Sequence, residues 1–100
     1  MIDLSKDAAD PLWHALAVGF RGTKEQILER NRHEPLATVR CALMVAAVNV
    51  LEFTHLQAAR EFDRERSNVS AHVQAHEGRM DYDNLYREAY TTIEEELIYE

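Results

Sequence analysis

The clearest chemistry in the sequence lies in a run of small and polar residues between positions 66 and 77. At helical spacing one side of this run is apolar, and the other side collects short, uncharged side chains. The polar side holds Ser67, Asn68, Ser70, Ala71 and Gln74. Asparagine and glutamine amides pair bidentately with adenine, and serine donates to or accepts from base edges. This pattern predicts a helix that reads the major groove of double-stranded DNA; an ordinary surface helix is the alternative.

The residues before this helix predict how it is positioned. Residues 54–57 match a capping box, which starts a helix that ends at about Phe62. The alanine pair at 58–59 lets a second helix cross closely, and a connection of about four residues separates the two helices. The order predicts a helix-turn-helix over residues 54–77.

Helix signals elsewhere predict an all-α fold, with five to six helices around a long central one in a single domain of residues 1–100. Asp10 is expected to be the N-cap of the first helix, with Pro11 at its first helical position, and Gly22 and Gly78 are expected to end helices. Apolar residues surround most of the segment 35–52, which is therefore the expected central helix. The helices are expected over residues 10–20, 23–30, 35–52, 54–62, 67–77 and 84–99.

Charge is distributed unevenly along the chain, whose net charge is −7. Residues 80–100 hold one Arg against seven acidic residues, whereas residues 14–79 hold nine Arg and Lys against eight Asp and Glu. A DNA-facing surface in the middle of the chain is therefore compatible with the electrostatics. Arg64 and Arg66, at the entrance to the predicted reading helix, are expected to reach phosphates or a guanine edge.

Composition and the N-terminus restrict the class of protein. The single cysteine, Cys41, excludes an intrachain disulfide and fits a reducing cytoplasm. Residues 1–7 lack the basic and apolar regions of a signal peptide. The most apolar stretch, residues 36–51, is too short and too polar to span a bilayer. We therefore expect a cytoplasmic protein without a membrane segment.

Other residues that could bind a metal or act as a nucleophile are better explained by packing. His72 and His76 have a spacing that can hold zinc, but no third ligand is evident, and their rings project from the inward half of the helix. Cys41 has no identifiable base or oxyanion site. The sequence therefore predicts packed histidines, an inert cysteine, no metal, no cofactor and no enzymatic activity.

A distributed pattern between about residues 13 and 97 connects these elements to a known family. Residues 16–28 combine an amphipathic helix with a Thr-Lys-Glu-Gln-Ile-Leu capping segment, and residues 40–47 form the start of a long helix. Residues 54–62 combine a capped start with a terminal Phe, and residues 64–69 read Arg-Glu-Arg-Ser-Asn-Val. This pattern resembles domain IV, the C-terminal DNA-binding domain of the bacterial replication initiator DnaA, which has a Trp-repressor-like helical fold.

The resemblance implies roles for particular residues. In that family the signature Arg-Asp-His-[Ser/Thr]-Thr-Val reads the major groove, which here implies DNA contacts from Arg64, Glu65, Arg66, Ser67 and Asn68. A basic loop before the long helix reaches the minor groove, which here implies contacts from Arg30, Arg32, His33, Thr38 and Arg40.

The sequence also departs from the family. Glu65, Arg66 and Asn68 replace Asp, His and Thr of the signature, so a different base preference is expected. The phosphate-binding pattern Gly-x-x-x-x-Gly-Lys-[Ser/Thr] of the initiator's ATPase part is absent from the sequence. The interpretation is therefore a free-standing DNA-binding module that regulates transcription or replication. The alternative is a protein-interaction module on the same fold, which modulates an initiator or another DNA-binding factor; the acidic helix 84–99 would dock a partner or a second copy.

Overall fold

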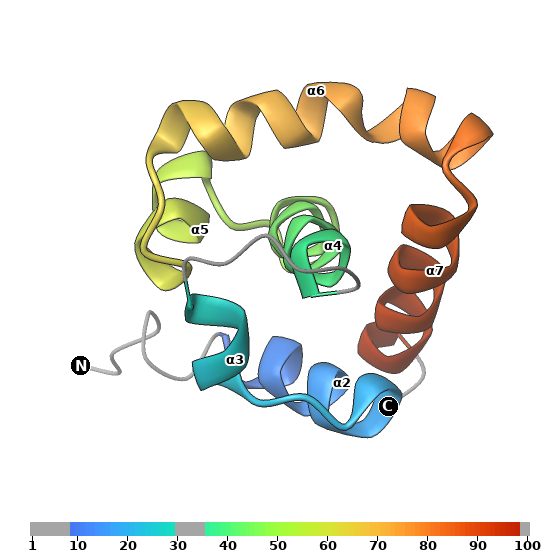
Figure 1. The fold of residues 1–100 in the computed structure, drawn as a ribbon. Coiled ribbons are helices and arrows are strands. Elements are labelled where there is room, and N and C mark those ends of the chain that lie inside the picture. The colour runs from blue at the N-terminus through green and yellow to red at the C-terminus, as the bar shows by residue number, and fades with distance from the viewer. Residues whose placement is uncertain (1–8, 30–35, 99–100) are drawn as a thin grey trace.

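The computed structural model describes residues 9–29 and 36–98, which form six helices and no strand. The expected all-α class is confirmed. The helices, labelled as in Figure 1, are α2 (Asp10–Phe20), α3 (Lys24–Leu28), α4 (Leu36–Asn49), α5 (His55–Glu61), α6 (Arg66–Tyr82) and α7 (Asn84–Ile98). None of these helices is both long and apolar enough to cross a bilayer.

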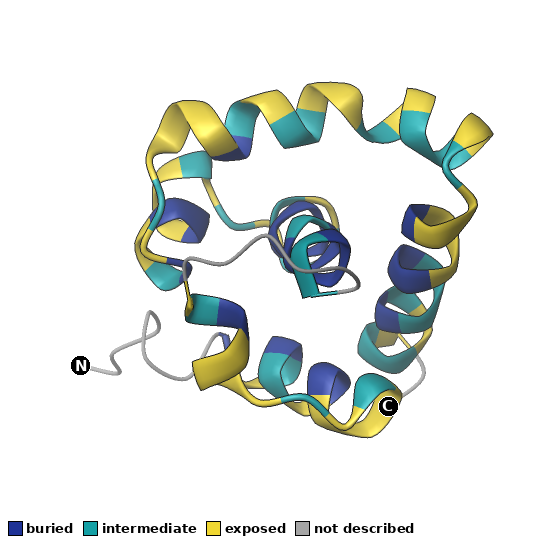
Figure 2. Ribbon diagram, viewed as in Figure 1, coloured by how far each residue is buried: buried dark blue, intermediate teal, exposed yellow. Residues whose placement is uncertain are grey.

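Helix α4 is the centre of the molecule, as its apolar circumference predicted. Figure 1 looks along its axis, and the other helices surround it. Residues 42–47 are all buried, and α4 contacts α3, α5, α6 and α7. Figure 2 shows that the surrounding helices turn their buried residues toward α4 and their exposed residues outward. Because α3, α5, α6 and α7 all pack on α4, this helix sets their relative positions.

Two capping boxes start α3 and α5 where the sequence predicted them. Thr23 Oγ1 accepts from the Gln26 amide at 3.2 Å, and Gln26 Oε1 accepts from the Thr23 amide at 2.9 Å. Thr54 and Gln57 form the same reciprocal pair at 3.0 and 2.8 Å. Each box satisfies donors that the first turn of a helix leaves free.

The ends of α2 differ from the prediction. Ala9 occupies the N-cap position and Asp10 is already helical. At the other end Arg21, with φ of 53°, takes the left-handed conformation expected of Gly22. Gly22 is required for a different reason: a Cβ there would lie 2.9 Å from Leu16 Cδ1. Close packing, and not a positive φ, explains this glycine.

Helix α6 continues through Gly78 to Tyr82, so the predicted helix end at Gly78 is wrong. A glycine inside a helix costs only about 1 kcal/mol, which tertiary contacts readily offset. Here the last turns of α6 pack against α7. Arg79 bonds Asp83 at 3.0 Å and lies 4.2 Å from the Tyr86 ring centroid. Asp83 in turn accepts from the Tyr86 amide and so begins α7.

Candidate nucleic-acid interface

The connection between α5 and α6 is anchored by one aromatic residue. Phe62 is fully buried, and its ring centroid lies 5.2 Å from that of Trp13. After it, Asp63 has a φ of 53°, and the Arg64 amide donates to the Ala59 carbonyl at 2.9 Å. Four residues, 62–65, separate the two helices, which agrees with the expected spacing. That this unit is a DNA-binding helix-turn-helix stays a prediction.

Helices α5 and α6 pack against each other. Ala58 and Ala59 are buried, and Val69 is the buried residue of α6. Small side chains let neighbouring helices approach closely, and the burial of the alanine pair is compatible with the predicted close crossing. The outward face of α6 is directed to solvent as a consequence (Figure 2).

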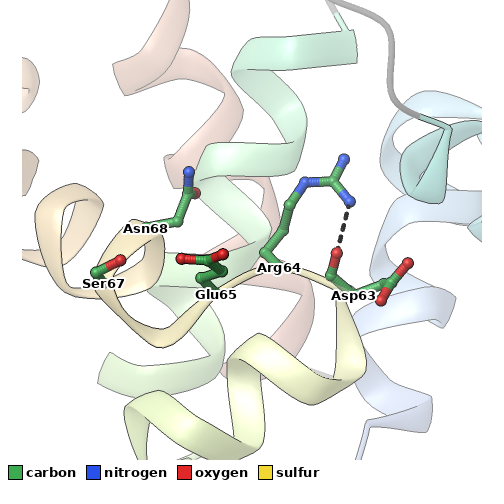
Figure 3. Close-up of a pocket in the computed structure, with 5 residues that line it drawn as sticks. All are labelled: Asp63, Arg64, Glu65, Ser67 and Asn68. Atoms are coloured by element: carbon green, nitrogen blue, oxygen red, sulfur yellow. Dashed lines mark hydrogen bonds between the residues drawn. The ribbon is translucent and has the colours of Figure 1, made fainter.

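The predicted reading face is exposed. Ser67, Asn68, Ala71 and Gln74 are all exposed. Two shallow surface hollows lie over this half of α6. The first is lined by Asp63, Arg64, Glu65, Ser67 and Asn68 (Figure 3). The second is lined by Glu65, Arg66, Ser67, Ser70, Ala71 and Gln74. The exposed N-terminal half of α6 is therefore indented, and a ligand has access to it.

Most polar groups on this face have no partner within the protein. In the part of the chain that the structure describes, the side chains of Glu65, Arg66, Ser67, Asn68 and Gln74 make no hydrogen bond or ion pair. Glu65 holds the N-cap position, yet its carboxylate does not cap the helix. Ser70 is the exception, because its hydroxyl lies 2.6 Å from His55 Nδ1. Unpartnered polar side chains on an exposed face remain available for a ligand.

Arg64 is used inside the protein. Its guanidinium donates to the carbonyls of Phe62 at 2.9 Å and Asp63 at 3.1 Å, and Figure 3 shows it turned away from Ser67 and Asn68. A third, longer bond of 3.4 Å reaches the carbonyl of Glu29, just after α3. Arg64 therefore stabilises the connection before α6, and it also lines the first hollow.

Arg40 is buried, which corrects the predicted DNA contact at this position. It donates through Nε to the Ile27 carbonyl at 2.6 Å and through Nη2 to the Glu29 carbonyl at 2.9 Å. Burial, and then the neighbouring charge of Arg64, lower the pKa of Arg40. Thr38 is only 4% exposed and Arg40 only 7% exposed, so neither is open to DNA. We name Arg40 and Arg64, which converge on the Glu29 carbonyl, the arginine clamp.

The remaining predicted contacts lie in the loop before α4. Arg30, Arg32 and His33 fall outside the described residues, and their predicted contacts with DNA stay predictions. The structure brings together Glu65, Arg66, Ser67, Asn68, Ser70, Ala71 and Gln74 on one side of α6.

The two histidines of α6 are packed, as predicted. His72 Nε2 lies 3.6 Å from Cys41 Sγ, and His76 Nδ1 lies 2.9 Å from the Tyr86 hydroxyl. Burial lowers the pKa of both, and the charge of Arg79 adds to the effect at His72. No group of three metal-binding side chains occurs among residues 9–29 and 36–98.

The sequence analysis missed a polar cluster that joins the end of α5 to α2 and α3. Trp13 Nε1 donates to Glu61 Oε2 at 2.8 Å, and Lys24 Nζ lies 3.2 Å from the same oxygen. Lys24 also lies 5.3 Å from the Trp13 ring centroid. The three residues come from α5, α2 and α3, and their separation in the sequence left no local signal of the contact.

The chain matches no protein-family model, no curated protein and no solved structure. The resemblance to the DNA-binding domain of DnaA therefore depends on the residues described above and stays a prediction.

Proposed function

We propose that the protein binds double-stranded DNA through the N-terminal half of α6 and acts as a small regulator of transcription or replication. The observation that carries this proposal is the set of unpartnered polar side chains on the exposed, indented face of α6. A recognition helix presents its first residues to base edges in the same way. The resemblance to DnaA domain IV supports the same role.

The charges around α6 predict how strongly DNA binding would depend on salt. Arg66 and Arg60 are exposed, whereas Arg40 and Arg64 are committed to main-chain carbonyls. Each phosphate contact contributes a slope of about −0.9 in a plot of log K against log salt. The described surface therefore provides few phosphate contacts, and affinity should be moderate.

The second candidate is a protein-interaction module, and the outer side of α7 favours it. Glu88 and Glu95 are exposed there. Leu85 and Ile98, on the same helix, are 43% and 55% exposed. A partner or a second copy of the chain would then dock on α7 while α6 remains free.

Binding to duplex DNA is tested by selection from a random duplex library, followed by titration of the selected duplex at several salt concentrations. The variant Arg66→Ala should weaken binding, by about 1–3 kcal/mol if it contacts a base, or reduce the salt slope by about one if it contacts a phosphate. The control is Arg87→Ala, because Arg87 is an exposed arginine on α7 whose side chain, within the described residues, bonds only Asn84 one turn earlier. A chain that binds no duplex, or loses affinity equally in both variants, contradicts the proposal.

A further inference from the structure

Three exposed residues, each three positions after the last, form a strip along α6 that turns through about 120° of the helix circumference. We name Asn68, Ala71 and Gln74 the reading strip; all three are exposed, and neither amide has a partner in the described chain. At about 1.5 Å per residue, the strip extends over roughly 9 Å of the helix axis. Base pairs stack at about 3.4 Å, so the strip matches roughly three base pairs.

The polar groups beside the strip are already in use. Ser70 bonds His55, and Arg79 bonds Asp83. Arginine paired with guanine is the commonest base contact, and it needs a free guanidinium. Beyond Arg66, the described part of α6 has no free guanidinium, so the strip lacks the usual group for reading guanine.

Each member of the strip matches a feature of an A·T pair. An amide offers one donor and one acceptor, and the major-groove edge of adenine offers the complementary N7 acceptor and N6 donor. Guanine offers two acceptors there, so an amide oxygen would face another oxygen or nitrogen lone pair. Ala71 lies between the amides with only a methyl group, which suits contact with the C5-methyl of thymine.

We propose that the reading strip recognises A·T base pairs in the major groove, with Asn68 and Gln74 bonded to adenines and Ala71 against a thymine methyl. This inference rests on the proposed function, because it requires α6 to enter the major groove. It adds a preference for A·T base pairs to that function, and it assigns the discrimination between A·T and G·C pairs to three side chains.

Chemically altered duplexes test the inference. In the duplex selected by the wild-type protein, uracil replaces thymine and removes only the C5-methyl group, or 7-deazaadenine replaces adenine and removes only N7. Wild-type affinity should fall about four-fold with uracil, the factor for one buried methyl group, and about five-fold or more with 7-deazaadenine. Ala71→Gly should bind the thymine and uracil duplexes equally. Asn68→Ala and Gln74→Ala should each lose about half of the response to 7-deazaadenine on a free-energy scale, because each amide contacts one adenine.

A matched control separates the contact from helix stability. Ala17→Gly makes the same substitution at an exposed position of α2 and should keep the full response to uracil. Selection of G·C-rich duplexes, or equal wild-type affinity for normal and altered duplexes, overturns the inference while leaving the proposed function intact. A wild-type protein that binds no duplex overturns both.

Discussion

Replacing Arg40 by Ala should lower the free energy of unfolding of the protein. It should remove no direct contact with DNA. The guanidinium is buried and supplies donors to the carbonyls of Ile27 and Glu29, near the end of α3. Carbonyls at a helix C-terminus have no partner within the helix, so a buried helix end depends on such donors. Without Arg40, the C-terminal end of the short α3 loses two of the hydrogen bonds that hold it to the central helix.

The expected size follows from the two bonds. A hydrogen bond that involves a charged group contributes about 1.5–3 kcal/mol. The Glu29 carbonyl keeps the longer bond from Arg64, so its loss is partial. Removing Arg40 also relieves the unfavourable burial of its charge, which is the main cause of its lowered pKa. We therefore expect the free energy of unfolding to fall by about 2–4 kcal/mol.

Urea unfolding followed by circular dichroism measures this change. With an m-value of about 1–3 kcal/mol per molar urea, a loss of that size lowers the midpoint by about 0.7–4 M. Arg66→Ala is the matched comparison, because Arg66 is exposed and unpartnered, and its loss should change the free energy of unfolding by less than about 0.5 kcal/mol. The reasoning would be refuted by an Arg40→Ala protein that unfolds at the wild-type urea midpoint but whose plot of log K for DNA against log salt is shallower by about one unit. That result would place the guanidinium on DNA.

Glycine substitutions and acid provide the remaining predictions. Gly78→Ala should raise thermal stability, because Ala gains about 0.5–1 kcal/mol in a helix and the new Cβ would lie 3.4 Å from only a tyrosine ring. Gly19→Ala should lower thermal stability, because its Cβ would lie 2.8 Å from Thr92 Cγ2; equal melting temperatures would contradict this packing argument. Burial lowers the pKa of His76, so the unfolded chain binds the proton more readily, and stability is lost as the pH falls below about 6.5. Urea midpoints at pH 7.5 and 5.5 measure this loss, which should be smaller in His76→Gln, and an unchanged loss would count against the assignment.

Local sequence signals predicted the elements of this fold well where they act over one or two turns. The capping boxes at Thr23 and Thr54 formed as expected, because each needs only residues three positions apart. The apolar circumference of α4 identified the central helix, since a helix that is apolar on most sides must be covered. The exposed side of α6 followed from helical periodicity, because polar residues at helical spacing lie on one side of a helix.

Signals that compete with packing were less reliable. Gly78 did not end α6, because contacts with α7 and the bond between Arg79 and Asp83 outweigh the small cost of a glycine within a helix. Gly22 did not supply the positive φ, because Arg21 did, and the glycine is needed against Leu16 instead. Both outcomes depend on neighbours that no local pattern identifies.

The sequence by itself determined that the chain is helical, which helix is central, and which side of α6 carries short polar groups. Tertiary structure alone decided which cations remain free: Arg40 and Arg64 are held by the carbonyl of Glu29, whereas Arg66 is exposed. The physical reason is that helix periodicity is encoded by nearby residues, but a guanidinium is buried or exposed according to main-chain groups that lie 11 and 35 positions away.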